Sequence, residues 1–318
     1  MMTRPPEIPS ATQMSLANWA MLIALSILWG GSFFFTKVAV AEISPMAIVF
    51  LRVALGALAL HAVLRLKGIA FPLTIAGFAP FLVMGLINNV VPFGLLTWGQ
   101  TEIASGLAAI LNAFTPISTV IILHLFTTSD RATPLKVAGV VLGFTGVAVM
   151  IGVEAVAGVG DHVVAELACL GATVSYGFAA LYGRRFRDTP ALVTATGQLT
   201  GSSLILVVMM LATGGAGLGD NWPSTPVITS MLALALLSTA LAYILFFRIL
   251  AQAGPANVML VTFLVPVSAI LAGALILGEV LEPRHWAGMA LIATALVTID
   301  GRIPRWLMRR RAAARGRI

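Results

Sequence analysis

Long apolar runs alternate with short polar, proline- or glycine-containing segments along almost the whole chain. Each run has close to the roughly 20 residues that an α-helix needs to cross a bilayer. The connections are short, except for a glycine-rich stretch around residues 213–226, and none could hold a separate soluble domain. The pattern predicts ten helices, at residues 17–39, 45–65, 73–98, 103–126, 134–152, 163–184, 191–213, 227–249, 255–278 and 284–300.

Composition supports helices that face lipid. Of the 318 residues, 59% are hydrophobic and 10% are charged, whereas a soluble domain carries about 25% charged residues. The single cysteine, Cys169, lies inside an apolar run and cannot form an intramolecular disulfide. We therefore predict an all-α polytopic membrane protein.

The distribution of basic residues predicts the orientation. With a cytoplasmic N-terminus, most of the 19 Lys and Arg residues fall in cytoplasmic segments, which is the bias that the positive-inside rule describes. Both tails, residues 1–15 and 303–318, are then cytoplasmic. The first tail lacks the features of a signal peptide. The second is strongly basic, and after a membrane span we expect it to contact anionic lipid headgroups rather than nucleic acid.

Two halves of the chain share an internal repeat. Residues 111–123 (LNAFTPISTVIIL) align with residues 261–273 (VTFLVPVSAILAG) at an offset of 150, which pairs Pro116 with Pro266. Trp29 and Tyr176 pair at an offset of 147. The alignment divides the chain into five-helix units at 17–152 and 163–300. Because five is odd, the second unit is inverted in the membrane, an arrangement typical of transporters with a midplane site and alternating access.

Four stretches carry a pattern known from other proteins: ILWGGSFFFTKVA (27–39), SPMAIVFLRVALGALAL (44–60), GLAAILNAFTPISTVIIL (106–123) and NVMLVTFLVPVSAILAGALILGEVLEPRHWAGMALI (257–292). In these the chain resembles EamA-type carriers of the drug/metabolite transporter superfamily. The resemblance implies ten helices around a central cavity and, often, export of amino acids, among them aromatic ones, or of other small metabolites. Asp130 departs from the pattern, since its counterpart in the second unit is Gly278-Glu279.

Paired polar residues interrupt the third and eighth predicted helices. Asn88 and Asn89 are adjacent and thus point about 100° apart on a helix. At an offset of 150 they align with Ser238 and Thr239. Such residues either hydrogen-bond neighbouring helices or line a cavity, and both interpretations stay open. If one residue of each pair faces a cavity and the other faces a neighbouring helix, the two pairs contribute to a site near the middle of the membrane.

The fourth helix adds a polar face and a proline. Asn112 and Thr115 share one face beside Pro116, and Thr262 precedes Pro266 in the repeat. Prolines free a backbone carbonyl one turn earlier, so we predict kinks at Pro92, Pro116 and Pro266. Close helix packing is the alternative explanation for these small polar residues.

Aromatic residues complete the predicted cavity. Trp29 and Tyr176 occupy equivalent positions of the repeat, and Tyr243 aligns with Phe93. Phe33 is a further candidate. The predicted cavity residues are Trp29, Asn88, Asn89, Asn112, Thr115, Tyr176, Ser238, Thr239, Tyr243 and Thr262.

Arg52 is the one basic residue well inside a predicted span. It either anchors helix ends structurally or acts as counter-ion for a substrate carboxylate. No Asp or Glu lies deep in a span, so the sequence favours transport down a gradient over proton coupling through an intramembrane carboxylate.

These features favour a carrier that exports small metabolites, most of all neutral and aromatic amino acids, from the cytoplasm across a plasma (bacterial inner) membrane. Drugs and other metabolites remain alternative substrates. A channel would need a selectivity element, and an enzyme a nucleophile–base or metal constellation; we find neither pattern. We therefore expect a small-molecule substrate, with no catalytic residues, metal, cofactor or nucleic acid. A monomer is compatible with the sequence.

Overall fold

The computed structural model describes residues 14–71, 74–103, 105–128, 132–152, 162–213, 222–277 and 281–300. Most of both predicted tails lie outside these residues, as do Asp130 and Glu279. All regular secondary structure in the described part is helical, and this part contains no strand.

The first half of the chain forms five helical rods, two of them composite. Its elements are α1 (Leu16–Ala39), α2 (Pro45–Leu66), α3 (Ile75–Gly85) with η1 (Leu86–Val90) and α4 (Val91–Glu102), α5 (Ser105–Asn112) with α6 (Thr115–Phe126), and α7 (Pro134–Ile151).

The second half repeats this order. Its elements are α9 (Val163–Gly183) with the short η2 (Arg184–Phe186), α10 (Ala191–Ala212), α11 (Thr225–Ala235) with η3 (Leu236–Leu241) and α12 (Ala242–Ala253), α13 (Pro255–Val258) with α14 (Val261–Leu277), and α15 (Pro283–Asp300).

Polar caps set where several helices begin. The side chains of Ser15, Ser44 and Thr133 each accept a hydrogen bond from the backbone N–H three residues later, which satisfies a donor that the first helical turn leaves free. At the other end, Gly152 and Gly254 follow α7 and α12 with positive φ angles, a backbone conformation that favours glycine. These local signals keep the connections short.

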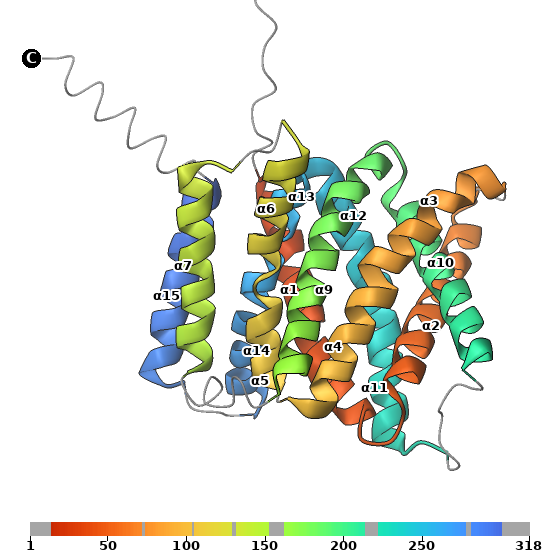
Figure 1. The fold of residues 1–318 in the computed structure, drawn as a ribbon, viewed down its shortest axis with the longest axis horizontal. Helices are drawn as coiled ribbons and strands as arrows, with labels where there is room; N and C mark the ends of the chain where they lie inside the picture. Colours follow the sequence, from red (N-terminus) through yellow and green to blue (C-terminus); the bar gives the residue numbers. More distant parts are fainter. Residues whose placement is uncertain are drawn as a thin grey trace, which may run out of the picture.

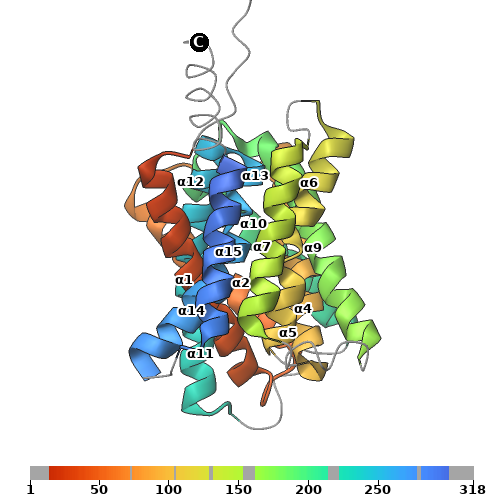
Figure 2. The same cartoon turned by 90° about the vertical axis from the view of Figure 1, so that its left-hand side faces the viewer.

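The two halves interlock rather than lie side by side. In the first half α2 packs against α10, α11 and η3, while α10 of the second half packs against α3 and η1. Helix α1 similarly packs against α11, α12 and α14. The helices α7 and α15 form a pair at one edge of the bundle (Figures 1 and 2), where Gly146 and Gly288 allow close backbone approach. Each half therefore completes its packing only with the other.

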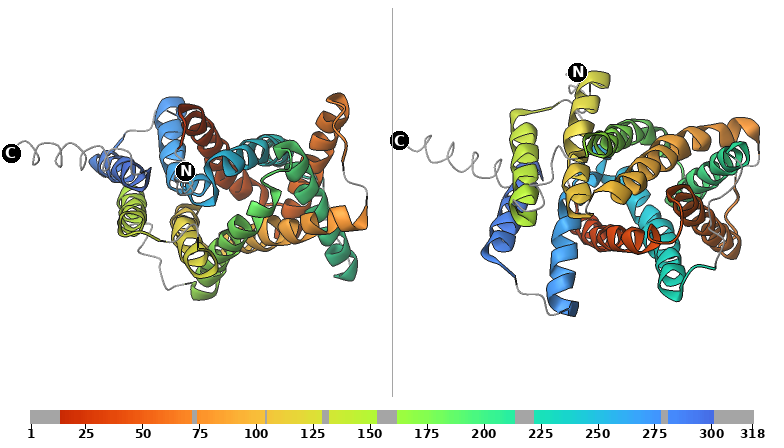
Figure 3. Two further views of the ribbon diagram at one scale, coloured as in Figure 1. Left: turned by 90° about the horizontal axis from the view of Figure 1, so that it is seen from above. Right: turned by 60° about the horizontal axis from the view of Figure 1, so that its bottom comes forward.

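The predicted fold class is confirmed. Seven helices are long and apolar enough to cross a membrane, and Pro134–Met150 and Pro255–Ser268 are shorter apolar helices. The described helices form ten rods that coincide with the ten predicted runs. Helix α1 begins and α15 ends at the same end of the bundle (Figures 1 and 2). The left view of Figure 3 looks along the rods from above, with α7 and α15 set to one side.

The three prolines at the predicted kinks lie at different places in their rods. The fourth rod is broken at Ala113 and Phe114 into α5 and α6, so Pro116 lies in the first turn of a new helix rather than inside a kinked one. A proline is tolerated there because the first-turn N–H has no intrahelical acceptor. Pro92 also lies in the first turn of its segment, α4, directly after η1. Pro266 lies inside α14.

Candidate functional site

Two π-helices lie at equivalent places in the two halves. One is η1, the stretch LINNV, and the other is η3, the stretch LLSTAL, which starts 150 residues later. The N–H of Val91 bonds to the carbonyl of Leu86, and the N–H of Ala242 to that of Leu237, five residues back in each case. Such wide turns are rare, and they often occur at functional sites because they displace backbone groups from the regular ladder.

The first π-helix is held by the second half of the chain. Pro92 has no N–H to offer the carbonyl of Asn88, and the Tyr243 hydroxyl donates to that carbonyl instead, at 3.2 Å. The hydroxyl shares its one hydrogen between this carbonyl and Oδ1 of Asn89, to which the hydrogen bond is short. Nδ2 of Asn88 donates to Oε1 of Gln198 at 2.9 Å, and Nδ2 of Asn89 to the Ser202 hydroxyl at 2.8 Å. These partners come from α10 and α12, and the Ser175 hydroxyl of α9 donates to the Ile87 carbonyl of η1 at 2.6 Å.

The second π-helix is held in turn by the first half. Nε of Arg52 donates to the Thr239 hydroxyl at 2.7 Å, and its Nη2 donates to the Ser238 carbonyl at 3.4 Å. The Ser238 hydroxyl donates to the carbonyl of Leu28 in α1 at 2.6 Å. The Arg52 guanidinium also lies 3.8 Å from the centre of the Phe93 ring, within cation–π range. The two π-helices are therefore bonded across the repeat interface in both directions.

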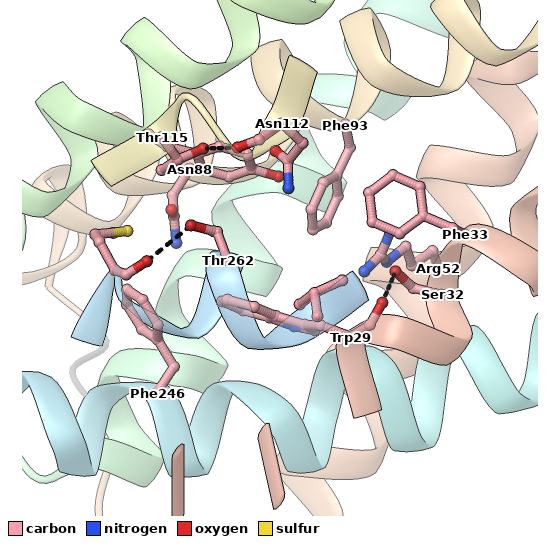
Figure 4. Close-up of a pocket in the computed structure, with 13 residues that line it drawn as sticks. Trp29, Ser32, Phe33, Arg52, Asn88, Phe93, Asn112, Thr115, Phe246 and Thr262 are labelled. Carbon is pink, nitrogen blue, oxygen red and sulfur yellow. Dashed lines mark hydrogen bonds between the residues drawn. The ribbon is translucent and has the colours of Figure 1, made fainter. Parts of the chain in front are cut away.

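A cavity of about 560 Å³, a volume that includes the open space at its mouth, lies beside these networks. Both halves contribute side chains, from α1, α2, η1, α4, α5 and α6 in the first and from α9, α12 and the α13–α14 region in the second. The lining residues are Trp29, Ser32, Phe33, Arg52, Asn88, Phe93, Asn112, Thr115, Tyr176, Phe246, Met259, Thr262 and Val265 (Figure 4). This mixture of aromatic walls and few polar groups is typical of small-molecule sites.

The structure separates the predicted site residues into two layers. Six of them lie on the cavity wall: Trp29, Asn88, Asn112, Thr115, Tyr176 and Thr262. The other four lie behind the wall, in the networks that hold the π-helices: Asn89, Ser238, Thr239 and Tyr243. The adjacent asparagines therefore divide as their 100° separation suggests, with Asn88 on the cavity and Asn89 fully buried among helices.

Several wall residues escape the sequence reasoning. Ser32, Phe246, Met259 and Val265 carry no polar or repeat signal strong enough to separate them from ordinary apolar helix residues. Gln198 could have been found, because a glutamine in the middle of an apolar run needs a partner. Its Oε1 accepts from Asn88, whereas its Nε2 has no partner within the part of the chain that the structure describes.

The cavity carries one charged side chain. Arg52 is 7% exposed, and the remaining polar groups of the wall are amides and hydroxyls together with the phenol of Tyr176 and the indole N–H of Trp29. Among the described residues, no group of three or more His, Cys, Asp or Glu side chains could hold a metal ion. The wall is thus suited to binding by hydrogen bonds, charge and aromatic contact.

Comparison with known proteins identifies the family. The sequence profile of the EamA-like transporter family matches residues 17–152 and again residues 163–299. An uncharacterized transporter of Bacillus subtilis, YvbV, is 29% identical over 91% of this chain and 93% of its own length. The uncharacterized inner membrane transporter YedA of Escherichia coli K12 is 25% identical over 89% of this chain and 90% of its own.

A solved crystal structure supports the fold. It aligns with a TM-score of 0.71 at 16% identity and covers 89% of this chain and 97% of that one. The two matches of the family profile together span most of the sequence, and the apolar helices mark a multi-pass membrane protein. The chain belongs to the EamA-like transporter family and is a membrane transporter.

Proposed function

We propose that this transporter exports small neutral amino acids, aromatic ones included, by alternating access through the cavity between its two halves. One observation supports the proposal most: the cavity wall is built from both inverted halves, with aromatic side chains around a few polar groups. When two halves that share one site rock against each other, the site opens to one side and then the other.

The cavity chemistry favours a small amphipathic substrate. Trp29, Phe93 and Phe246 provide apolar surface, and Asn112 and Thr115 provide hydrogen-bonding groups. A single arginine offers little charge compensation for a phosphorylated substrate. The same aromatic walls also suit apolar drugs, which makes drug export the second candidate function.

The proposed location is a bacterial inner membrane with both chain ends in the cytoplasm. The basic residues of the presumed cytoplasmic segments support this orientation, and YedA, a similar protein, is named an inner membrane transporter. The basic C-terminal segment would then meet anionic headgroups. Since no carboxylate among the described residues lines the cavity, we propose transport driven by the substrate gradient.

Uptake of labelled amino acids, one at a time, into proteoliposomes tests this function. We expect saturable flux that unlabelled amino acid on the opposite side accelerates, since a carrier exchanges and a pore does not. An imposed proton gradient should leave the rate nearly unchanged. Flux of drugs but of no amino acid would favour the second candidate.

The position of the site has its own test. Asn112→Ala removes an amide from the cavity wall and should lower flux several-fold while expression and membrane insertion stay normal. Asn257→Ala is a matched control, because Asn257 is an amide outside the wall whose Nδ2 donates to the carbonyl of Ala253. Equal flux in both well-inserted variants would contradict the site.

A further inference from the structure

We infer that Arg52 binds the carboxylate of the transported substrate, so that the site selects small monocarboxylates with a hydrogen-bond donor, such as an amino group, at their other end. The inference rests on the proposed function and names the recognition chemistry of the same cavity. The alternative is that Arg52 only joins helices through hydrogen bonds and does not contact the substrate.

The first argument is charge. Arg52 lines the cavity at 7% exposure, and no carboxylate of the described residues forms an ion pair with it. A charge held out of water is costly unless a partner compensates it. The Phe93 ring gives partial compensation from one face. A substrate carboxylate would supply the missing negative charge in a site of low dielectric.

The second argument is hydrogen-bonding capacity. A guanidinium has five N–H donors in a planar fork. The described contacts use one donor well, from Nε to Thr239 at 2.7 Å, and one weakly, from Nη2 to the Ser238 carbonyl at 3.4 Å. These bonds fix the plane of the group, and among the described residues Nη1 and one N–H of Nη2 have no hydrogen-bond partner. That arrangement favours a carboxylate, which the fork can bind through two parallel bonds.

The third argument is the polarity of the opposite end. Figure 4 shows Arg52 at one end of the cavity and Asn88, Thr115 and Thr262 at the other. The Thr115 hydroxyl donates to the Asn112 carbonyl at 2.7 Å, and the Thr262 hydroxyl to the Met259 carbonyl at 2.9 Å. Each hydroxyl has thus used its only hydrogen and offers a ligand lone pairs alone. Arg52 therefore offers donors at its end of the cavity, and the two threonine hydroxyls offer acceptors at the other end.

Paired substrates test the inference. Proteoliposomes with the wild-type protein receive labelled phenylalanine or leucine, or the matching amines that lack the carboxylate, phenethylamine and 3-methylbutylamine. We expect at least about tenfold faster saturable uptake of the acids, since a hydrogen bond to a charged group changes affinity by that order. Arg52→Gln should abolish the preference, and Arg52→Lys should retain only part of it, because an ammonium cannot form the two-bond fork.

Two further variants separate recognition from folding. Arg248→Gln removes an exposed arginine of α12 outside the cavity wall and should keep the preference. Thr239→Val removes the acceptor that orients Nε but keeps the charge of Arg52, so it should lower the melting temperature and weaken the preference for the acids less than Arg52→Gln does.

The outcomes are distinct. The inference is supported if the wild type prefers the amino acids to the amines, Arg52→Gln loses this preference and Arg248→Gln keeps it. Wild-type uptake of acids and amines at equal rates would overturn the carboxylate anchor and leave amino-acid export standing. Equal loss of preference in Thr239→Val and Arg52→Gln would assign Arg52 a structural role. Absence of flux with every compound would overturn the proposed function together with the inference.

Discussion

At the scale of single residues, Tyr243 shows how a buried hydroxyl compensates for a proline. It supplies the hydrogen bond that Pro92 cannot give to the Asn88 carbonyl, and it also bonds to Asn89. We predict that Tyr243→Phe destabilises the protein by about 1–3 kcal/mol, because two buried acceptors lose the one donor that they share. The melting temperature of the detergent-solubilised protein measures the loss.

Tyr182→Phe is the matched control for this change. Tyr182 is half-buried in α9 and packs edge-on against Phe186, and its hydroxyl forms no hydrogen bond within the described part of the chain. The same loss of an oxygen should therefore leave the melting temperature almost unchanged. An equal fall in both variants would mean that the hydroxyl of Tyr243 does not stabilise η1.

Glu42 offers a residue-scale prediction outside the membrane-spanning segments. Its carboxylate accepts bonds from the hydroxyl and the N–H of Ser224, at 2.6 and 2.7 Å, and so joins the α1–α2 loop to the start of α11. These bonds, the hydroxyl's most of all, lower the pKa of Glu42 below its ordinary value of 4.5. The contact therefore stabilises the fold at pH values above the ordinary carboxyl pKa. This stabilisation is lost as the pH falls through the lowered pKa of Glu42.

Carbon-13 NMR of glutamate-labelled protein in nanodiscs measures this titration. We expect the Glu42 midpoint below 4.5 in the wild type and closer to 4.5 in Ser224→Ala, which removes the hydroxyl but keeps the N–H. A midpoint that is identical in both proteins would show that the loop contact does not form in the membrane.

At the scale of helices, glycines set how closely the π-helices approach their partners. A Cβ added at Gly85, directly before η1, would lie 2.7 Å from the Gln198 carbonyl oxygen and from the Ser202 nitrogen of α10. Backbone atoms cannot give way as side chains do. We predict that Gly85→Ala separates the two helices and costs about 1–3 kcal/mol of stability.

Gly94 provides the internal comparison. It lies in α4, and nothing approaches within 4 Å of a Cβ added there. Gly94→Ala should therefore raise stability slightly, by about 0.5–1 kcal/mol, through the entropy that a helical glycine loses on folding. Thermal unfolding of the two variants under one condition gives the test. A similar effect of both substitutions would argue against the tight η1–α10 contact.

The element scale also shows what could be predicted from sequence. Apolar run length predicts the ten rods, and the offset of 150 places Asn88-Asn89 and Ser238-Thr239 at matching points. The sequence pattern cannot predict the π-helices, because their wide turns depend on partners that are distant in the chain, such as Arg52 and Tyr243. For the same reason, Tyr243 and Thr239 could not be assigned behind the cavity wall, since polar residues look alike in sequence whichever neighbour they meet.

At the scale of the whole molecule, the two halves are joined by reciprocal hydrogen bonds. Arg52 of the first half reaches η3, and Tyr243 of the second half reaches η1. Rocking of one half against the other must strain or exchange contacts of this kind. The proposed alternating access therefore requires helices of opposite halves to move relative to each other at the cavity.

The pair α1 and α14 allows this movement to be tested. The hydroxyls of Ser26 and Ser268, one from each half, lie 2.6 Å apart. With Cys169→Ser as background, to remove the native thiol, the double variant Ser26→Cys/Ser268→Cys should form a disulfide on mild oxidation. We predict that oxidation reduces exchange flux of a labelled amino acid at least about tenfold and that a reductant restores it. Each single cysteine variant should be insensitive to the same oxidant. Mass spectrometry measures how completely the protein is cross-linked. If completely cross-linked protein keeps full flux, α1 and α14 stay together throughout the cycle. The moving interface would then lie elsewhere between the two halves.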